Sequence, residues 1–134
     1  MMKINSICII DDDPIVVFGI RKMLNSILTY DELHTYGNGK LALDGITEMV
    51  KNNQGPPDLI FLDINMPIMD GWQFLKEFID IPVENGVRIN IITSSIDSYD
   101  QKNWELYKTK THHTLTYNRK PLRKDDLIKM SKVA

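Results

Sequence analysis

Residues 7–13 read I-C-I-I-D-D-D, an apolar run that ends in three consecutive aspartates. A second run of this kind, L-I-F-L-D, occupies residues 59–63 and also ends in an acid. Near-continuous apolar runs of four residues are typical of strands that are covered on both faces. These two segments therefore predict buried parallel strands whose carboxyl ends carry carboxylates.

Three further runs complete a set of five expected strands: residues 89–92, residues 115–117 and a weaker one at residues 33–36. Three of the intervening segments place apolar side chains on one helical face. These sets are Val16, Ile20, Met23, Leu24 and Ile27; then Ala42, Ile46, Met49 and Val50; then Phe74, Leu75, Phe78 and Ile79. A fourth helix is expected over residues 97–108, and a short fifth one after Pro121 that carries Leu127, Ile128 and Met130.

Strands and helices thus alternate along the whole chain. This order predicts an α/β fold, in which a mostly parallel sheet has helices on both faces and right-handed crossovers. Five such units favour a five-stranded, doubly wound, flavodoxin-like sheet of order 2-1-3-4-5 with five helices. In that order the first and third strands are neighbours, and ligands bind at their carboxyl ends.

The composition fits one globular domain over residues 1–134. Of the 134 residues, 43% are hydrophobic and 25% are charged, which is ordinary for a folded domain. The formal net charge of −2 argues against direct nucleic-acid binding. The single cysteine, Cys8, is expected to be a small core residue in a reducing compartment. No segment predicts a signal peptide or a membrane helix, so we expect a cytoplasmic protein without a membrane partner.

The ends of the expected strands carry the candidate site. In the predicted topology, one cleft collects carboxylates, a hydroxyl and an ammonium group, which belong to Asp11, Asp12, Asp63, Thr93 and Lys120. Two adjacent acids that face a third would repel each other unless a cation lay between them. Mg²⁺ suits such a set of oxygen ligands. The remaining acid, Asp13, precedes Pro14 and is better explained as a helix N-cap.

Asp63 is a candidate nucleophile, because carboxylates accept phosphoryl groups to form aspartyl phosphates. Such a transfer needs positioning and charge neutralisation more than covalent help. Mg²⁺ and Lys120 would supply the neutralisation, and Thr93 would donate its hydroxyl to a phosphoryl oxygen. Taken singly, Lys120 also fits a solvated surface lysine, and Thr93 fits an ordinary strand-end threonine.

Four motifs in this order resemble the receiver domain of two-component response regulators. They are I-C-I-I-D-D-D-P-I at residues 7–15, F-L-D-I-N-M-P-I-M-D-G at 61–71, I-I-T-S-S at 91–95 and Y-N-R-K-P at 117–121. The resemblance covers nearly the whole chain. It implies a single-domain receiver over residues 1–134 with no output domain.

The resemblance also implies a role for each site residue. Asp63 would be the phosphoacceptor, and Mg²⁺ would be held by Asp12 and Asp63 directly, by Asp11 mainly through water, and by the main-chain carbonyl of Asn65. Thr93 would be the switch hydroxyl, Lys120 the phosphate-binding lysine and Tyr117 the switch aromatic. The Lys120–Pro121 peptide bond would be cis.

The implied function is phosphorylation-dependent signalling. A histidine kinase or a histidine phosphotransfer protein would donate the phosphoryl group, and the surface of the fourth helix, fifth strand and fifth helix would then change. The chain would catalyse only its own phosphorylation and dephosphorylation. Direct binding of a downstream protein and onward relay of the phosphoryl group are not separated by the sequence.

Two other functions are weaker. A phosphorylation-independent receiver-like binding module conflicts with the presence of the acids, the hydroxyl and the lysine. A phosphatase of the haloacid-dehalogenase type would need a second acid in D-x-D, where this chain has Asn65.

The chain departs from the family before the fifth strand, where it has K-T-H-H at residues 110–113 in place of small residues. The sequence therefore does not define where the fourth helix ends or, as a result, the shape of the output surface. His112 and His113 should point to opposite sides of a strand, which makes them a poor metal pair. Trp72 and Trp104 are expected to be packing residues.

Overall fold

The computed structural model describes residues 2–132. Strands and helices alternate, as predicted. The elements are β1 (Met2–Ile10), α1 (Pro14–Ile27), β2 (Leu28–Tyr36), α2 (Gly39–Lys51), β3 (Leu59–Asp63), α3 (Gly71–Ile79), β4 (Arg88–Thr93), α4 (Ser98–Lys108), β5 (Thr114–Arg119) and α5 (Lys124–Met130). The strands form one parallel sheet of order β2-β1-β3-β4-β5, which confirms the predicted topology.

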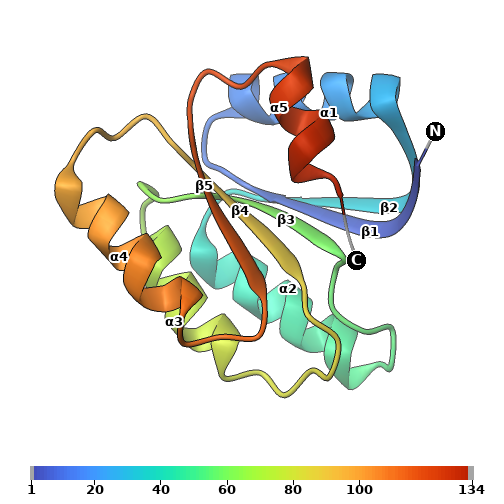
Figure 1. Ribbon diagram of the computed structural model, residues 1–134. Helices are drawn as coiled ribbons and strands as arrows, with labels where there is room; N and C mark the ends of the chain where they lie inside the picture. Colours follow the sequence, from blue (N-terminus) through green and yellow to red (C-terminus); the bar gives the residue numbers. More distant parts are fainter. Residues whose placement is uncertain (1, 133–134) are drawn as a thin grey trace.

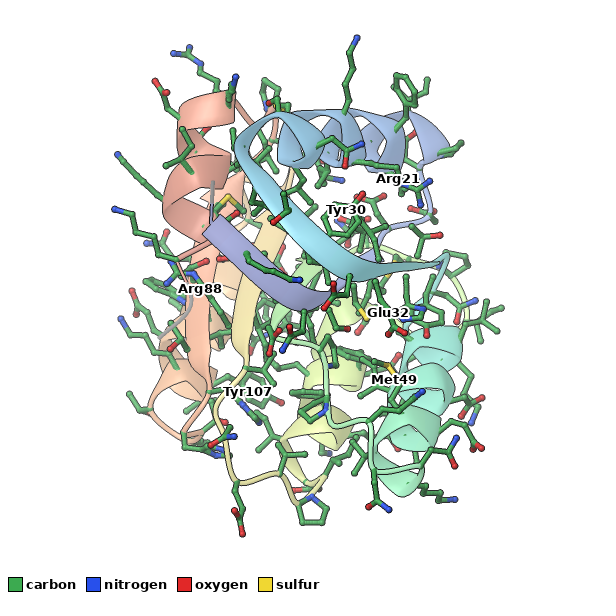
Figure 2. All side chains as sticks on the ribbon, turned by 90° about the vertical axis from the view of Figure 1, so that its right-hand side faces the viewer. Arg21, Tyr30, Glu32, Met49, Arg88 and Tyr107 are labelled. Atoms are coloured by element: carbon green, nitrogen blue, oxygen red, sulfur yellow. The ribbon has the colours of Figure 1, made fainter. Side chains whose placement is uncertain are left out.

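Helices cover both faces of this sheet. Helices α1 and α5 lie on one face, and α2, α3 and α4 lie on the other (Figure 1). In Figure 2, Arg21 of α1 lies on one side of the sheet, whereas Met49 of α2 and Tyr107 of α4 lie on the other. Each face has its own apolar core, and the β3 side chains alternate between them: Ile60 and Leu62 belong to one core, Leu59 and Phe61 to the other.

Strands β1 and β2 are longer than predicted. Strand β1 begins at Met2 rather than at residue 7, and β2 begins at Leu28 rather than at residue 33. The two strands pair along this extension, while β3 joins β1 only from Ile7 onward. Beyond β3 the extension of β1 alternates exposed Lys3 with buried Ile4, so it has no continuous apolar run to mark it as a strand.

The segment before β5 corrects another expectation. Strand β5 begins at Thr114, so His112 and His113 precede it and do not alternate across it. Their ring centroids are 4.2 Å apart, and the prediction that the two rings point to opposite sides is wrong. His112 is exposed, while His113 is buried and packs against Phe78.

Several smaller expectations are confirmed. Asp13 is the N-cap of α1, and its side chain accepts a hydrogen bond from the backbone N–H of Ile15. Cys8 is fully buried, and burial raises the pKa of its thiol to about 12. The Lys120–Pro121 peptide bond is cis. Among residues 2–132, no helix combines the length and the apolar character that crossing a lipid bilayer requires.

Candidate functional site

Three carboxylates meet at the carboxyl edge of the sheet. Asp11 and Asp12 follow β1, and Asp63 is the last residue of the neighbouring β3. One oxygen from each side chain lies within 4.8 Å of the others. Asp11 and Asp63 are 3% and 5% exposed, whereas Asp12 faces solvent. The cluster therefore consists of two buried acids and one acid that is exposed to solvent.

Lys120 is the cation of this cluster. Its Nζ donates hydrogen bonds to Asp11 Oδ2 over 2.9 Å and to Asp63 Oδ1 over 3.3 Å. Its backbone N–H donates to the carbonyl of Thr93 over 2.8 Å, which fixes Lys120 beside the end of β4. Burial opposes the ammonium charge, but the hydrogen bond to Asp11 and the charge of Asp63 outweigh it and raise the pKa of Lys120.

Asp63 is held at one of its two carboxylate oxygens. Oδ1 accepts hydrogen bonds from the backbone N–H of Ile64, over 2.9 Å, and from Lys120. Burial, followed by the charge of Asp11, raises the pKa of Asp63 to about 6, although Lys120 and the Ile64 N–H act in the opposite direction. Within residues 2–132, Oδ2 accepts no hydrogen bond, so Oδ2 is the carboxylate oxygen that is free to contact another group.

The donor set fits a hard divalent cation. Three carboxylates and a single ammonium group leave excess negative charge in this cluster, and Mg²⁺ prefers oxygen ligands of this kind. Asn65, whose carbonyl the sequence prediction included, is exposed in the loop two residues after Asp63.

Thr93 and Tyr117, the two expected switch residues, lie in different parts of the fold. Thr93 ends β4 and is fully buried, and its Oγ1 accepts a hydrogen bond from the backbone N–H of Ser95 over 3.0 Å. Tyr117 lies in the middle of β5 and stacks against Trp104, with ring centroids 5.7 Å apart. The structure therefore places Thr93 at the strand end beside Lys120, and Tyr117 against α4.

Sequence reasoning missed a polar contact between α3 and α4. The indole Nε1 of Trp72 donates to Oδ1 of Asp100 over 2.8 Å, and Asp100 is 7% exposed. Trp72 and Trp104 do pack, as expected, but each indole also donates a hydrogen bond. No sequence signal marks Asp100 as buried, because an acid in the first turn of a helix is ordinarily explained by the helix dipole.

Comparison with known proteins identifies the family of this chain. A sequence model described as the response regulator receiver domain matches residues 7–132. The chain belongs to this family. Receiver domains are signalling modules of two-component systems, in which an aspartyl phosphate and Mg²⁺ are typical and histidine kinases and phosphotransfer proteins are among the partners.

Individual relatives give the same assignment. The chain is 33% identical over 95 residues to sporulation initiation phosphotransferase F of Bacillus subtilis, covering 69% of this chain and 67% of the relative. It is 33% identical over 106 residues to a protein-glutamate methylesterase/protein-glutamine glutaminase of Desulfotalea psychrophila, covering 78% of this chain. The chain spans 28% of the length of that methylesterase.

A solved structure is also similar. A two component response regulator from Cytophaga hutchinsonii superposes with a TM-score of 0.80 at 28% sequence identity. The match covers 96% of this chain and 94% of that one. The receiver fold therefore extends over the elements that carry the acid cluster.

Proposed function

We propose that this receiver domain accepts a phosphoryl group onto Asp63 from a phosphohistidine of a kinase or phosphotransfer protein, and that the phosphoryl group changes the binding of a protein partner. The observation that carries the proposal is the bridging position of Lys120 between Asp11 and Asp63, beside a third carboxylate. This arrangement supports the proposal, because it brings three carboxylates and an ammonium group together at one edge of the sheet. That the chain acts as a single domain over residues 1–134 stays a prediction.

In the transfer step, Asp63 Oδ2 would attack the phosphorus atom of the donor. An oxygen–phosphorus bond forms, the phosphorus–nitrogen bond breaks, and the leaving imidazole nitrogen keeps the electron pair. The transition state spreads charge over the phosphoryl oxygens, and Lys120, already 3.3 Å from Asp63 Oδ1, would neutralise part of that charge. The buried hydroxyl of Thr93 would donate to another phosphoryl oxygen.

Asp11, Asp12, Asp63 and the carbonyl of Asn65 would hold Mg²⁺. When bound, Mg²⁺ supplies charge neutralisation at the phosphoryl oxygens. The raised pKa of Asp63, about 6, still leaves the carboxylate ionised at neutral pH, which nucleophilic attack requires.

The output surface would be formed by α4, β5 and α5. A phosphoryl group adds about −1.5 to −2 charges next to Thr93, which ends β4, and the loop after Thr93 leads directly into α4. Tyr117 lies between this helix and the sheet, stacked on Trp104. A shift of Thr93 would therefore change the surroundings of both α4 and β5.

The test is phosphorylation by acetyl phosphate in the presence of Mg²⁺, followed by intact-mass measurement. We expect one added phosphoryl group on the wild-type chain, and none on Asp63→Asn or after chelation of the metal. Asp13→Asn is the matched control, because this neighbouring acid caps α1 and asparagine is an equally good N-cap. It should be phosphorylated like the wild type.

The same samples separate the alternatives. An adduct that persists in Asp63→Asn would assign the modification to another residue and contradict the proposal. If acetyl phosphate gives no adduct and the phosphoryl mimic beryllofluoride with Mg²⁺ does not bind either, a phosphorylation-independent binding module becomes the better explanation.

A further inference from the structure

Helix α4 is attached to the domain mainly through polar and aromatic contacts. Its one buried residue is an acid, Asp100, whereas the shorter α3 buries five residues. The exposed side chains of α4 include Tyr99 at 63% and Leu106 at 48%. Since helices in proteins are stabilised mostly by burying an apolar face, the position of α4 depends on a few specific contacts.

The first contact joins α4 to α3. Asp100 is the third residue of α4, and its Oδ1 accepts the 2.8 Å hydrogen bond from Trp72 Nε1. The ring of Trp72 also stacks on Tyr107, with centroids 5.9 Å apart. Within residues 2–132, no lysine, arginine or histidine forms an ion pair with Asp100. A buried carboxylate without a cation depends strongly on its hydrogen-bond donors.

Trp72 is itself fixed relative to the phosphoacceptor. It follows Gly71, whose backbone N–H donates to the carbonyl of Ile64 over 2.9 Å. A side chain at Gly71 would collide with the backbone of Asp63 and Ile64, so α3 begins in direct contact with the end of β3. The indole of Trp72 is therefore a fixed point to which α4 is attached.

A series of hydrogen bonds connects Thr93 to the first turn of α4. The N–H of Ser95 donates to Thr93 Oγ1 over 3.0 Å, and the N–H of Asp97 donates to Ser95 Oγ over 3.1 Å. Asp97 is the N-cap of α4, and its carbonyl accepts from the N–H of Asp100 over 3.2 Å. Movement of the Thr93 side chain would break the first of these bonds and free the loop that holds the α4 N-cap.

We propose that the Trp72–Asp100 hydrogen bond is a latch that fixes α4 in the unphosphorylated position, and that Thr93 releases it through Ser95 and Asp97. The inference rests on the proposed function, because a phosphoryl group on Asp63 supplies the pull on Thr93. Trp72 and Asp100 are positioning residues, since neither touches the reacting atoms. On release the carboxylate of Asp100 reaches water and no longer needs the indole donor.

Trp72→Phe tests the latch. The phenyl ring still offers an aromatic surface to Tyr107, but it has no N–H to donate. Asp100 therefore loses a hydrogen bond in the latched position and in no other. Weakening one of two conformations shifts the population toward the other, so Mg²⁺ with beryllofluoride should bind about 10-fold more tightly than to the wild type, as expected for a hydrogen bond to a charged group. Calorimetry measures this affinity. Amide hydrogen exchange over residues 97–108 should also be faster in the variant without beryllofluoride.

Trp104→Phe is the matched control. It removes an indole N–H that also attaches α4, but this donor bonds the carbonyl of Leu115, over 2.9 Å, and is not part of the Thr93–Ser95–Asp97 series of hydrogen bonds. The latch does not include this bond, so the beryllofluoride affinity should stay within about 2-fold of the wild type. Equal tightening in both variants would overturn the latch, because it would show general loosening of α4.

Rescue separates positioning from packing. In the double variant Trp72→Phe/Asp100→Asn, the side chain of residue 100 is neutral, and burying it costs less free energy. The affinity for beryllofluoride should therefore return toward the wild-type value. An affinity that stays at the Trp72→Phe level would contradict the latch, since a packing defect at residue 72 would not respond to the charge of Asp100.

Ser95→Ala provides a second route if Trp72→Phe does not fold. Ser95 is a half-buried loop residue, and its loss removes the acceptor for the Asp97 N–H. In the wild type, beryllofluoride should increase amide hydrogen exchange in α4. It should also bind to Ser95→Ala, but the increase in that variant should be smaller. An unchanged increase would overturn the path.

The wild-type and Asp63→Asn proteins distinguish failure of the proposed function from failure of the latch alone. Beryllofluoride binding that is absent from the wild type, or that persists in Asp63→Asn, would overturn the proposed function and the latch together. Binding that requires Asp63 but is no tighter in a folded Trp72→Phe variant would overturn the latch alone.

Discussion

At the scale of the single residue, His113 shows how burial changes the protonation of a titratable group. His113 is 4% exposed, and its Nδ1 accepts a hydrogen bond from the backbone N–H of Val87 over 2.9 Å. The ring must therefore be neutral, with its proton on Nε2, which has no hydrogen-bond partner in the described part of the chain. Burial, together with the neighbouring His112, lowers the pKa of His113 to about 4.

This pKa predicts a loss of stability in mild acid. Below pH 6.5 the unfolded chain binds a proton at His113 that the folded chain does not bind until about pH 4. The stabilisation is therefore complete above pH 6.5 and decreases as the pH falls, by about 2 kcal/mol between pH 7 and 5. In His113→Gln, whose amide oxygen can still accept from Val87, the free energy of unfolding in urea should fall less over this interval. Equal losses in the two proteins would contradict the assignment.

Among the connecting elements, the loop between β3 and α3 contains a strained turn. The N–H of Met69 donates to the carbonyl of Pro67 over 2.8 Å, which closes a three-residue turn around Ile68. Ile68 has a φ of 71° and is 82% exposed. A β-branched residue in this left-handed region is a steric outlier, and its side chain gains little from packing.

Ile68→Asn should relieve this strain. Asparagine tolerates positive φ, so we expect the free energy of unfolding to rise by about 1 kcal/mol. Ile15→Asn is the control, because Ile15 is 79% exposed in the first turn of α1 and the same change there should stay within about 0.5 kcal/mol. Urea unfolding of both variants checks the prediction. No difference between them would show that the turn is not strained.

The strands and helices could be predicted from the sequence wherever a single pattern of apolar residues dominated. The buried runs of β3 and β4 and the amphipathic faces of α1, α2 and α3 follow directly from apolar periodicity. The first half of β2 was not predictable, because it mixes exposed polar residues with partly buried ones and its partner strand lies 26 residues away. Pairing across such a distance is a tertiary property that local sequence does not encode.

Part of the candidate site could likewise be predicted from the sequence, and part could not. Strand ends and parallel topology are enough to bring Asp11, Asp63 and Lys120 together, because parallel strands all end at one edge of the sheet. The burial of Asp100 was not predictable, since its donor Trp72 is 28 residues earlier and belongs to another helix. A sequence pattern locates a side chain along its own element, but it does not identify the partners that determine its environment.

At the scale of the whole molecule, folding concentrates charge from both ends of the chain. Lys120 donates a hydrogen bond to Asp11, although the two residues are 109 positions apart in the sequence, and the β1–β3 pairing brings Asp63 beside them. A preformed cluster of this kind does not exist in the unfolded chain, so a cation that binds the cluster stabilises the fold.

Mg²⁺ should therefore raise the stability of the protein through its acids. At a Mg²⁺ concentration ten times the dissociation constant, the free energy of unfolding should increase by about 1.4 kcal/mol relative to the metal-free protein. Asp12→Asn should abolish most of this increase, because Asp12 is the exposed acid of the cluster. Its loss removes a ligand without leaving a buried charge unpaired, so the metal-free variant should remain folded.

Asp13→Asn is the control for this experiment, since its side chain caps α1 and the increase with Mg²⁺ should be retained. Thermal or urea unfolding with and without chelator gives both numbers. If Asp12→Asn and the wild type gain equally from Mg²⁺, the ion binds elsewhere on the surface. If neither the variants nor the wild type gain stability, the three carboxylates beside Lys120 do not form a Mg²⁺ site.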